Sequence, residues 1–299
     1  MSVRELIGAS HTNVERQNLS VGGRSVAMDL EATFGTPAPV IGMVHLPALP
    51  GAPNCERGIE AIRDRAVTDA EALEAGGVDG LIVENYGDVP FYPDSVPAHT
   101  VASMTRVASD VADATGLPIG INVLRNDGEA ALSVAAAVGA EFLRINVHTG
   151  ARVTDQGVLE GTAHETLRLR DRLDADVAVV ADVDVKHSAA LSDGQSIESA
   201  LKDTVERGLA DAVIVSGPGT GAPLEGGSLA AALGARAEGP DVPILVGSGV
   251  DAGSVGRLLG RADGVIVGTA LKRGGETAAP VEAARVAELV ERADSVRDE

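Results

Sequence analysis

The sequence contains few aromatic residues and one cysteine, which limits how its core is built and excludes a disulfide-stabilised fold. Aromatic residues make up 2% of the 299 residues, with no Trp, so a chain that is 44% hydrophobic must build its core from Ala, Val, Leu and Ile. Such aliphatic interiors are typical of parallel β/α barrels. The single cysteine, Cys55, excludes an internal disulfide. We therefore expect a reducing, cytoplasmic location.

Positive charge is also scarce, and no long apolar run is free of charge. Lys and Arg total 24 against 44 Asp and Glu, a net charge of −20, and the lysines are Lys186, Lys202 and Lys272. This charge repels nucleic acid and anionic membranes, so we expect neither as a partner. A Lys-poor acidic surface favours a halophilic protein, whose self-repulsion is screened by salt, over an ordinary acidic one. Homo-oligomer formation stays open.

Eight apolar, β-branched segments alternate with helical patterns after residue 39. The expected strands are 40–46, 80–85, 118–123, 142–147, 177–185, 212–217, 243–249 and 264–270, and the expected helices lie near 58–75, 98–115, 127–138, 162–174, 196–207, 227–237, 252–260 and 281–292. Eight strand–helix units predict a single (β/α)₈ TIM barrel over residues 28–299. Residues 1–27 are polar and lack periodicity, so we expect a disordered tail or a natural start at Met28.

Three long segments follow expected strands on the face where barrel sites lie. These are residues 46–57, residues 86–97, which carry three of the aromatic residues, and residues 148–161, which are compatible with a small hairpin. Extended loops on this face favour covers over a bound substrate.

Glycine-rich loops end the sixth, seventh and eighth expected strands. Glycine lets the backbone approach a ligand, and its N–H groups can surround an anion. The alternative is that these glycines only permit tight turns. Three consecutive loops favour phosphate binding, with the candidates Gly217, Gly219, Thr220, Gly247, Ser248, Gly249, Gly268 and Thr269.

Charged residues alternate with valines along the fifth expected strand. Side chains in a strand alternate between faces, so Asp182, Asp184 and Lys186 share the face opposite Val183 and Val185 and point into the barrel. The fourth strand repeats this pattern with Arg144, Asn146 and His148. Burying these groups is costly unless they pair or bind something. One interpretation is a structural salt-bridge layer made of Arg144, Asp182 and Asp184.

We favour a functional role for the residues at the strand exits. The catalytic candidates are Asp184, Lys186, Glu84, Asn146 and His148, and the substrate-binding candidates are His45, Asn85, Asn122, Arg125 and Asp182. Asp184 is suited to act as general base or nucleophile, and Lys186 as an electrophile or imine-forming amine. Carboxylates at the exits would also suit Mg²⁺, although the cofactor and any metal ligands remain unknown. Hydrolase, isomerase and lyase chemistry all stay open.

The chain resembles the BtpA/SgcQ family over residues 40–272. The motifs that carry the resemblance are IGMVHLPALPGAP (41–53), GGVDGLIVENYGDVPF (76–91), GINVLRND (120–127), FLRINVHTGARVTDQG (142–157), ADVDVKHS (181–188) and VIVSGPGTG (213–221). The resemblance implies a phosphate-binding type of TIM barrel. The N-terminal extension departs from the family pattern.

Two functions remain after this resemblance. The first is an enzyme that acts on a phosphorylated sugar or a nucleoside or nucleotide, which fits the glycine loops and the charged lumen. The second is a non-catalytic assembly or stability factor, because the namesake of the family is needed for photosystem I stability. We favour the enzyme, since a scaffold does not require a charged lumen.

Overall fold

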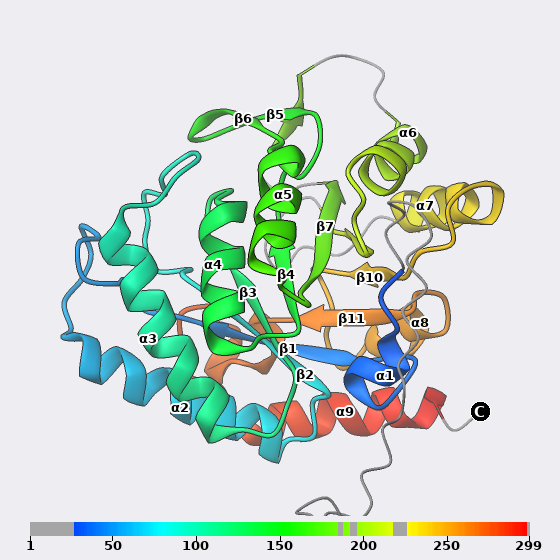
Figure 1. The fold of residues 1–299 in the computed structure, drawn as a ribbon. Helices are drawn as coiled ribbons and strands as arrows, with labels where there is room; N and C mark the ends of the chain where they lie inside the picture. The colour runs from blue at the N-terminus through cyan, green and yellow to red at the C-terminus, as the bar shows by residue number, and fades with distance from the viewer. Residues whose placement is uncertain (1–26, 185–187, 192–195, 218–225, 298–299) are drawn as a thin grey trace, which may run out of the picture.

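The computed structural model describes residues 27–184, 188–191, 196–217 and 226–297, which form a closed barrel of eight parallel strands (Figure 1). The order around the barrel is β1-β11-β10-β9-β7-β4-β3-β2. All eight expected strands are confirmed: β1 Val40–His45, β2 Gly80–Glu84, β3 Ile119–Asn122, β4 Phe142–Ile145, β7 Ala178–Asp184, β9 Ala212–Val215, β10 Ile244–Val246 and β11 Gly264–Val267. The sequence pattern therefore predicted the fold class correctly.

Helices follow the strands and pack around the outside of the barrel (Figure 1). Their bounds are α2 Ile59–Ala75, α3 Ala98–Ala114, α4 Gly128–Val138, α5 Ala163–Leu173, α6 Ile197–Lys202, α7 Gly226–Glu238, α8 Val255–Leu259 and α9 Ala283–Arg297. The helix α6 continues into a π-helical turn, η1, over Asp203–Arg207. None of the helices in the described ranges is both long and apolar enough to cross a membrane.

The predicted hairpin within residues 148–161 is confirmed. It consists of β5 (Ala151–Thr154) and β6 (Gly157–Glu160), which pair antiparallel. The short strand β8 (Ala189–Ala190) joins the other edge of β5. This small sheet lies outside the barrel, at the end where β4 and β7 finish (Figure 1).

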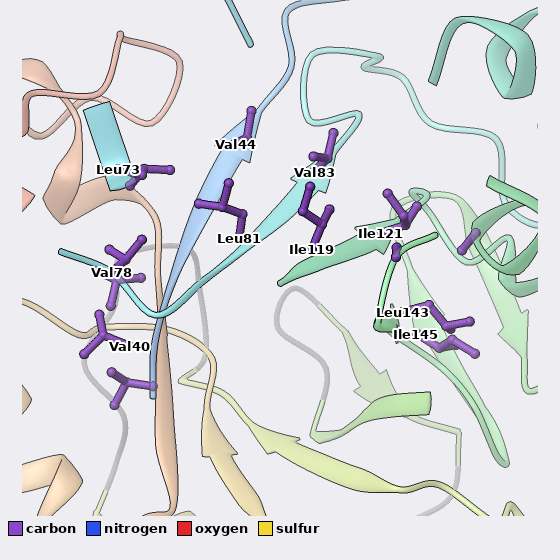
Figure 2. Close-up of a cluster of buried hydrophobic side chains, with 14 of the residues drawn as sticks. Val40, Val44, Leu73, Val78, Leu81, Val83, Ile119, Ile121, Leu143 and Ile145 are labelled. Carbon is purple, nitrogen blue, oxygen red and sulfur yellow. The ribbon is translucent and has the colours of Figure 1, made fainter. Parts of the chain in front are cut away.

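The larger core lies between the strands and the helices. Figure 2 shows that Val40, Val44, Leu81 and Val83 of β1 and β2 belong to it, together with Leu73 of α2. These strand positions alternate with the lumen-facing positions, as the two-residue period of a strand requires. Because both faces of each strand are covered, the strands consist of nearly continuous apolar runs.

A smaller core fills the lumen and is closed at one end by α1 (Leu30–Phe34), a helix that the sequence pattern did not predict. Asp29 caps α1 by accepting a hydrogen bond from the Ala32 N–H. The Phe34 ring meets Phe142 edge to face, with centroids 5.6 Å apart. Phe34 and Phe142 pack with Ile41, Ile82, Val180, Ile214, Leu245 and Ile266. This apolar cluster fills the end of the lumen that α1 closes, so a cavity of the lumen can open only at the opposite end.

Candidate functional site

A cavity of about 480 Å³ opens at the carboxyl ends of the barrel strands. This is the face on which β/α barrels place their active sites, because the loops that follow several strands meet there. The lining residues come from six loops or strand ends: Met43 and His45; Glu84, Tyr86, Val89 and Phe91; Leu124 and Arg125; Arg144 and Asn146; Gly247 to Asp251; and Ile266 and Gly268 to Ala270, with Arg285 from α9.

His45 and Glu84 lie side by side on this wall because β1 and β2 are neighbours in register. The Nε2 atom of His45 is 3.6 Å from Oε1 of Glu84, and both side chains are largely buried. The other ring nitrogen, Nδ1, lies 3.4 Å from the Thr277 carbonyl oxygen. A carbonyl only accepts, so Nδ1 carries a proton in this contact, and Nε2 is left to face the carboxyl group. The geometry places an imidazole nitrogen and a carboxyl group side by side at the cavity wall.

The ring of Tyr86 packs on His45, with centroids 4.7 Å apart. Tyr86 begins the loop after β2, which also carries Val89 and Phe91 into the cavity wall. Asp88 ties this loop to the loop after β1, because its carboxylate accepts a hydrogen bond from the Leu49 N–H at 2.7 Å. Burial raises the pKa of Asp88 above its ordinary value. The two long loops are therefore joined to each other beside the pair.

The loops after β10 and β11 form the part of the cavity wall on the other side of β1 from β2. A Cβ at Gly247 would lie 2.4 Å from a methyl of Ile214 and 2.8 Å from the Ser216 hydroxyl, so only glycine fits there. Gly249 has a φ of 69°, in the left-handed region that glycine adopts freely. Gly268 brings the backbone against His45, since its Cβ would lie 2.8 Å from Cε1 of that ring. The glycines thus shape the cavity as well as the turns.

Several main-chain donors in these two loops remain available to a ligand. Within the described part of the chain, the N–H groups of Ser248, Gly249, Thr269 and Ala270 have no acceptor. The Gly217 N–H differs, because it donates to the Ser248 hydroxyl at 2.6 Å. Ser216 adds a buried hydroxyl with no partner among the described residues. We call the loops 247–251 and 268–270 the glycine cradle.

Arg144 forms part of the cavity wall from β4 and is paired with Asp182 on β7. Its Nε and Nη2 atoms donate to the Asp182 carboxylate at 3.1–3.2 Å, and Asn146 donates to the same carboxylate at 2.8 Å. Asn122 donates to the Arg144 carbonyl and to Asn146. The suggested salt-bridge layer is therefore present for Arg144 and Asp182. Of this group, Arg144 and Asn146 line the cavity, whereas Asp182 and Asn122 hold them in place.

Asn85 also supports the cavity wall without lining the cavity itself. Its side chain accepts from the Leu124 N–H at 2.7 Å and donates to Asp88 at 3.1 Å. It therefore fixes the backbone that carries Leu124 and Arg125 into the cavity. Asn85 was expected to bind substrate, but its polar atoms are committed to these loops.

His148 does not share the lumen face with Arg144 and Asn146, which corrects the expected alternation. The strand β4 ends at Ile145, and the chain then turns toward the hairpin, so the two-residue period does not continue to residue 148. His148 is buried outside the cavity, with Nε2 2.7 Å from the Gly208 carbonyl oxygen. Burial lowers its pKa. The position supports a structural role.

The strand β7 is irregular near its carboxyl end, since its pairing with β9 shifts register between Asp182 and Asp184. The side chain of Asp184 and the candidates Lys186, Gly219 and Thr220 lie outside the described residues. Among the side chains that are described, no cluster of three or more His, Cys, Asp or Glu residues could hold a metal ion.

Two residues of the site gave no signal in the sequence. Arg285 lies in the first turn of α9, where an amphipathic pattern gives no reason to single it out. Thr277 lies in the loop after β11, and its hydroxyl is 2.9 Å from that of Thr269. Since its carbonyl also meets His45, Thr277 joins the glycine cradle to the His45–Glu84 pair.

The fold is that of a β/α barrel with a cavity at its carboxyl-end face. Among solved structures, a chain of Mycobacterium tuberculosis tryptophan synthase matches with a TM-score of 0.58 and 19% identity, over 89% of this chain and 98% of that one. At this identity the likeness shows the fold alone.

The chain belongs to the BtpA family, whose model matches residues 36–295. It is 46% identical over 264 residues to the "Photosystem I biogenesis protein BtpA" of Synechocystis, covering 88% of this chain and 91% of that protein. It is 48% identical over 259 residues to an uncharacterized protein of Thermococcus kodakarensis, covering 87% and 96%. The family resemblance inferred from the motifs is confirmed.

Proposed function

We propose that this protein is an enzyme that acts on a phosphorylated sugar or on a nucleoside or nucleotide. The phosphate binds in the glycine cradle, and the reacting part of the substrate lies against His45 and Glu84. The observation that carries the proposal is the contact between the two: the main-chain donors of Thr269 and Ala270 directly follow Gly268, whose backbone packs on the His45 ring.

The chemistry of the pair is proton transfer. The Nδ1 atom of His45 donates to Thr277, which leaves Nε2 beside Glu84, so this pair can exchange a proton with a substrate atom. Glu84 then acts as general base or general acid, and His45 as its relay. This chemistry is common to isomerases, lyases and hydrolases. Asp184 and Lys186 remain predicted catalytic residues from β7 and the segment after it.

The remaining cavity residues suit a polar substrate with one apolar face. Arg125 presents polar groups from the loop after β3, and Arg144 and Asn146 do so at the end of β4. The aromatic rings of Tyr86 and Phe91 line the β2 side. Asp182 neutralises Arg144, which therefore orients hydroxyl or carbonyl groups better than a second phosphate. A sugar or nucleoside unit has this mixture of surfaces.

A second candidate is a non-catalytic assembly or stability factor. The observation that favours it is the name of the Synechocystis relative, which describes photosystem I biogenesis. A protein of this kind requires neither available main-chain donors in a cavity nor a His–Glu pair beside them. A ligand screen separates the two functions.

The screen compares phosphorylated sugars and nucleoside monophosphates with their unphosphorylated parents by thermal shift. A ligand at one hundred times its Kd stabilises the folded state by about 2.7 kcal/mol. We expect selective stabilisation by one or a few phosphorylated compounds, and conversion of at least one on incubation. No selective stabilisation across the panel would overturn the enzyme and support the assembly factor.

A further inference from the structure

Arg285 reaches the cavity from α9 and presents unused donors beside the glycine cradle. Its Nε–H donates to the Ala270 carbonyl at 3.1 Å, which fixes the guanidinium against the loop after β11. Glu282 lies 3.9 Å from the same nitrogen, at the outer limit of an ion pair. Neither Nη atom has an acceptor within the described part of the chain, so the two Nη groups can donate to a ligand.

The charge distribution of the protein makes a cation beside the glycine cradle necessary for binding a dianion. The net charge of −20 repels any anion that approaches the protein. Arg144 cannot compensate, because Asp182 neutralises it, and main-chain N–H groups carry no net charge. Arg125 comes from the loop after β3, which lies across the barrel from β10. Asp251 at the rim is acidic, and its carboxylate accepts from the N–H groups of its own loop, Gly253 and Ser254. A dianion in the cradle therefore needs a local cation.

We propose that Arg285 is the cationic anchor of the phosphate site and selects a terminal phosphomonoester dianion. The proposal rests on the proposed function but is separate from it, since main-chain donors could hold a phosphate without Arg285. A guanidinium fork matches two oxygens of one phosphate group, and these charge-assisted hydrogen bonds are stronger than neutral ones. A phosphodiester has a single negative charge and a second substituent, so it fits this arrangement poorly.

The test measures binding of inorganic phosphate, ribose 5-phosphate, ribose and dimethyl phosphate by isothermal titration calorimetry at constant ionic strength. The proteins are the wild type, Arg285→Gln, Arg285→Lys and the control Arg292→Gln. Arg292 lies on the same helix but pairs with Glu288 on the surface. Glutamine can still donate to the Ala270 carbonyl, so the melting temperature without ligand should stay unchanged.

We expect the wild type to bind inorganic phosphate and ribose 5-phosphate, and neither ribose nor dimethyl phosphate. Arg285→Gln should weaken binding by about 10- to 100-fold, as for the loss of a charged hydrogen bond. Arg285→Lys should recover part of the loss, and Arg292→Gln should bind as the wild type does.

The results distinguish failure of the role of Arg285 from failure of the proposed function. Equal affinity in wild type and Arg285→Gln would overturn this inference and leave the proposed function standing. Absence of binding by any phosphorylated probe in the wild type would overturn both. If both Arg285 variants lose binding together with melting temperature, the arginine only clamps Ala270, and the inference fails.

Discussion

The ammonium group of Lys272 lies 3.7 Å from the carboxylate of Asp69, and neither side chain reaches solvent. Lys272 follows the glycine cradle, and its Nζ also donates to the Met43 carbonyl of β1 at 2.8 Å. Asp69, on α2, accepts from the Val281 N–H at 2.8 Å and from Arg65 at 3.0 Å. One carboxylate therefore holds both ends of the loop that carries Thr277.

This pair predicts a rise in stability at alkaline pH. Burial lowers the pKa of Lys272 from 10.5 to about 8, although the charge of Asp69 opposes the shift. Between these values the unfolded chain binds more protons than the folded one, so stability increases with pH. We expect a gain of at most about 3 kcal/mol between pH 8 and 10.5, measured by urea unfolding. The slope should disappear in Lys272→Met and persist in Lys202→Met, whose lysine is exposed. Parallel curves for wild type and Lys272→Met would contradict the assignment.

Replacing Asp69 should be costly, and more so at neutral than at alkaline pH. Asp69→Asn can keep the bond from Val281 but leaves the Lys272 charge buried without an anion. Breaking a buried pair in this way costs about 3–5 kcal/mol. We expect a loss of this size at pH 7 and a smaller one at pH 10, where Lys272 is neutral. Asp64→Asn, on the exposed face of the same helix, is the control. A cost that does not depend on pH would show that the charge of Lys272 plays no part.

Gly247 should tolerate no side chain. A methyl group there would meet Ile214 and Ser216, and overpacking of this kind costs about 1–3 kcal/mol. Gly247→Ala should therefore lower the melting temperature and weaken phosphate binding. At Gly227, in α7, a Cβ meets nothing within 4 Å, so Gly227→Ala should leave stability unchanged or raised by up to about 1 kcal/mol. Equal effects of the two variants in thermal unfolding would refute the packing argument.

Glu84→Gln should separate binding from chemistry. The amide keeps the shape of the side chain but cannot take a proton, so turnover of a substrate found in the ligand screen should fall by about 10²- to 10⁴-fold. The affinity for inorganic phosphate and the melting temperature should change little. Glu71→Gln, which alters an exposed residue of α2, should behave as the wild type in the same assays. Full activity in Glu84→Gln would remove Glu84 from the mechanism.

Salt should stabilise the protein. With a net charge of −20 and three lysines, repulsion between carboxylates opposes folding in dilute buffer. Screening by molar KCl should raise stability by at least about 1 kcal/mol, or about 2–4 °C in Tm. The measurement is thermal unfolding from 0.05 to 3 M KCl at constant pH. A flat or falling melting temperature would speak against adaptation to salt.

The local pattern of the sequence predicted most elements but failed where a pattern is too short or is interrupted. The five residues of α1 are fewer than two helical turns, so no amphipathic period can be recognised. On β7, the pairing with β9 shifts register between Asp182 and Asp184, an irregularity that a two-residue pattern cannot report. His148 was misplaced for a related reason, since the strand ends three residues before it.

The sequence by itself determined the barrel, because eight apolar runs separated by helical patterns have few other ways to bury their surfaces. It also placed Glu84, Asn146 and the glycines of the cradle near the strand ends. Tertiary structure alone decided that His45 meets Thr277, and that Arg285 reaches the cradle from α9. The reason is physical: periodicity reports the face of a residue on its own element, whereas these contacts exist only because closure of the barrel brings its last strand beside its first.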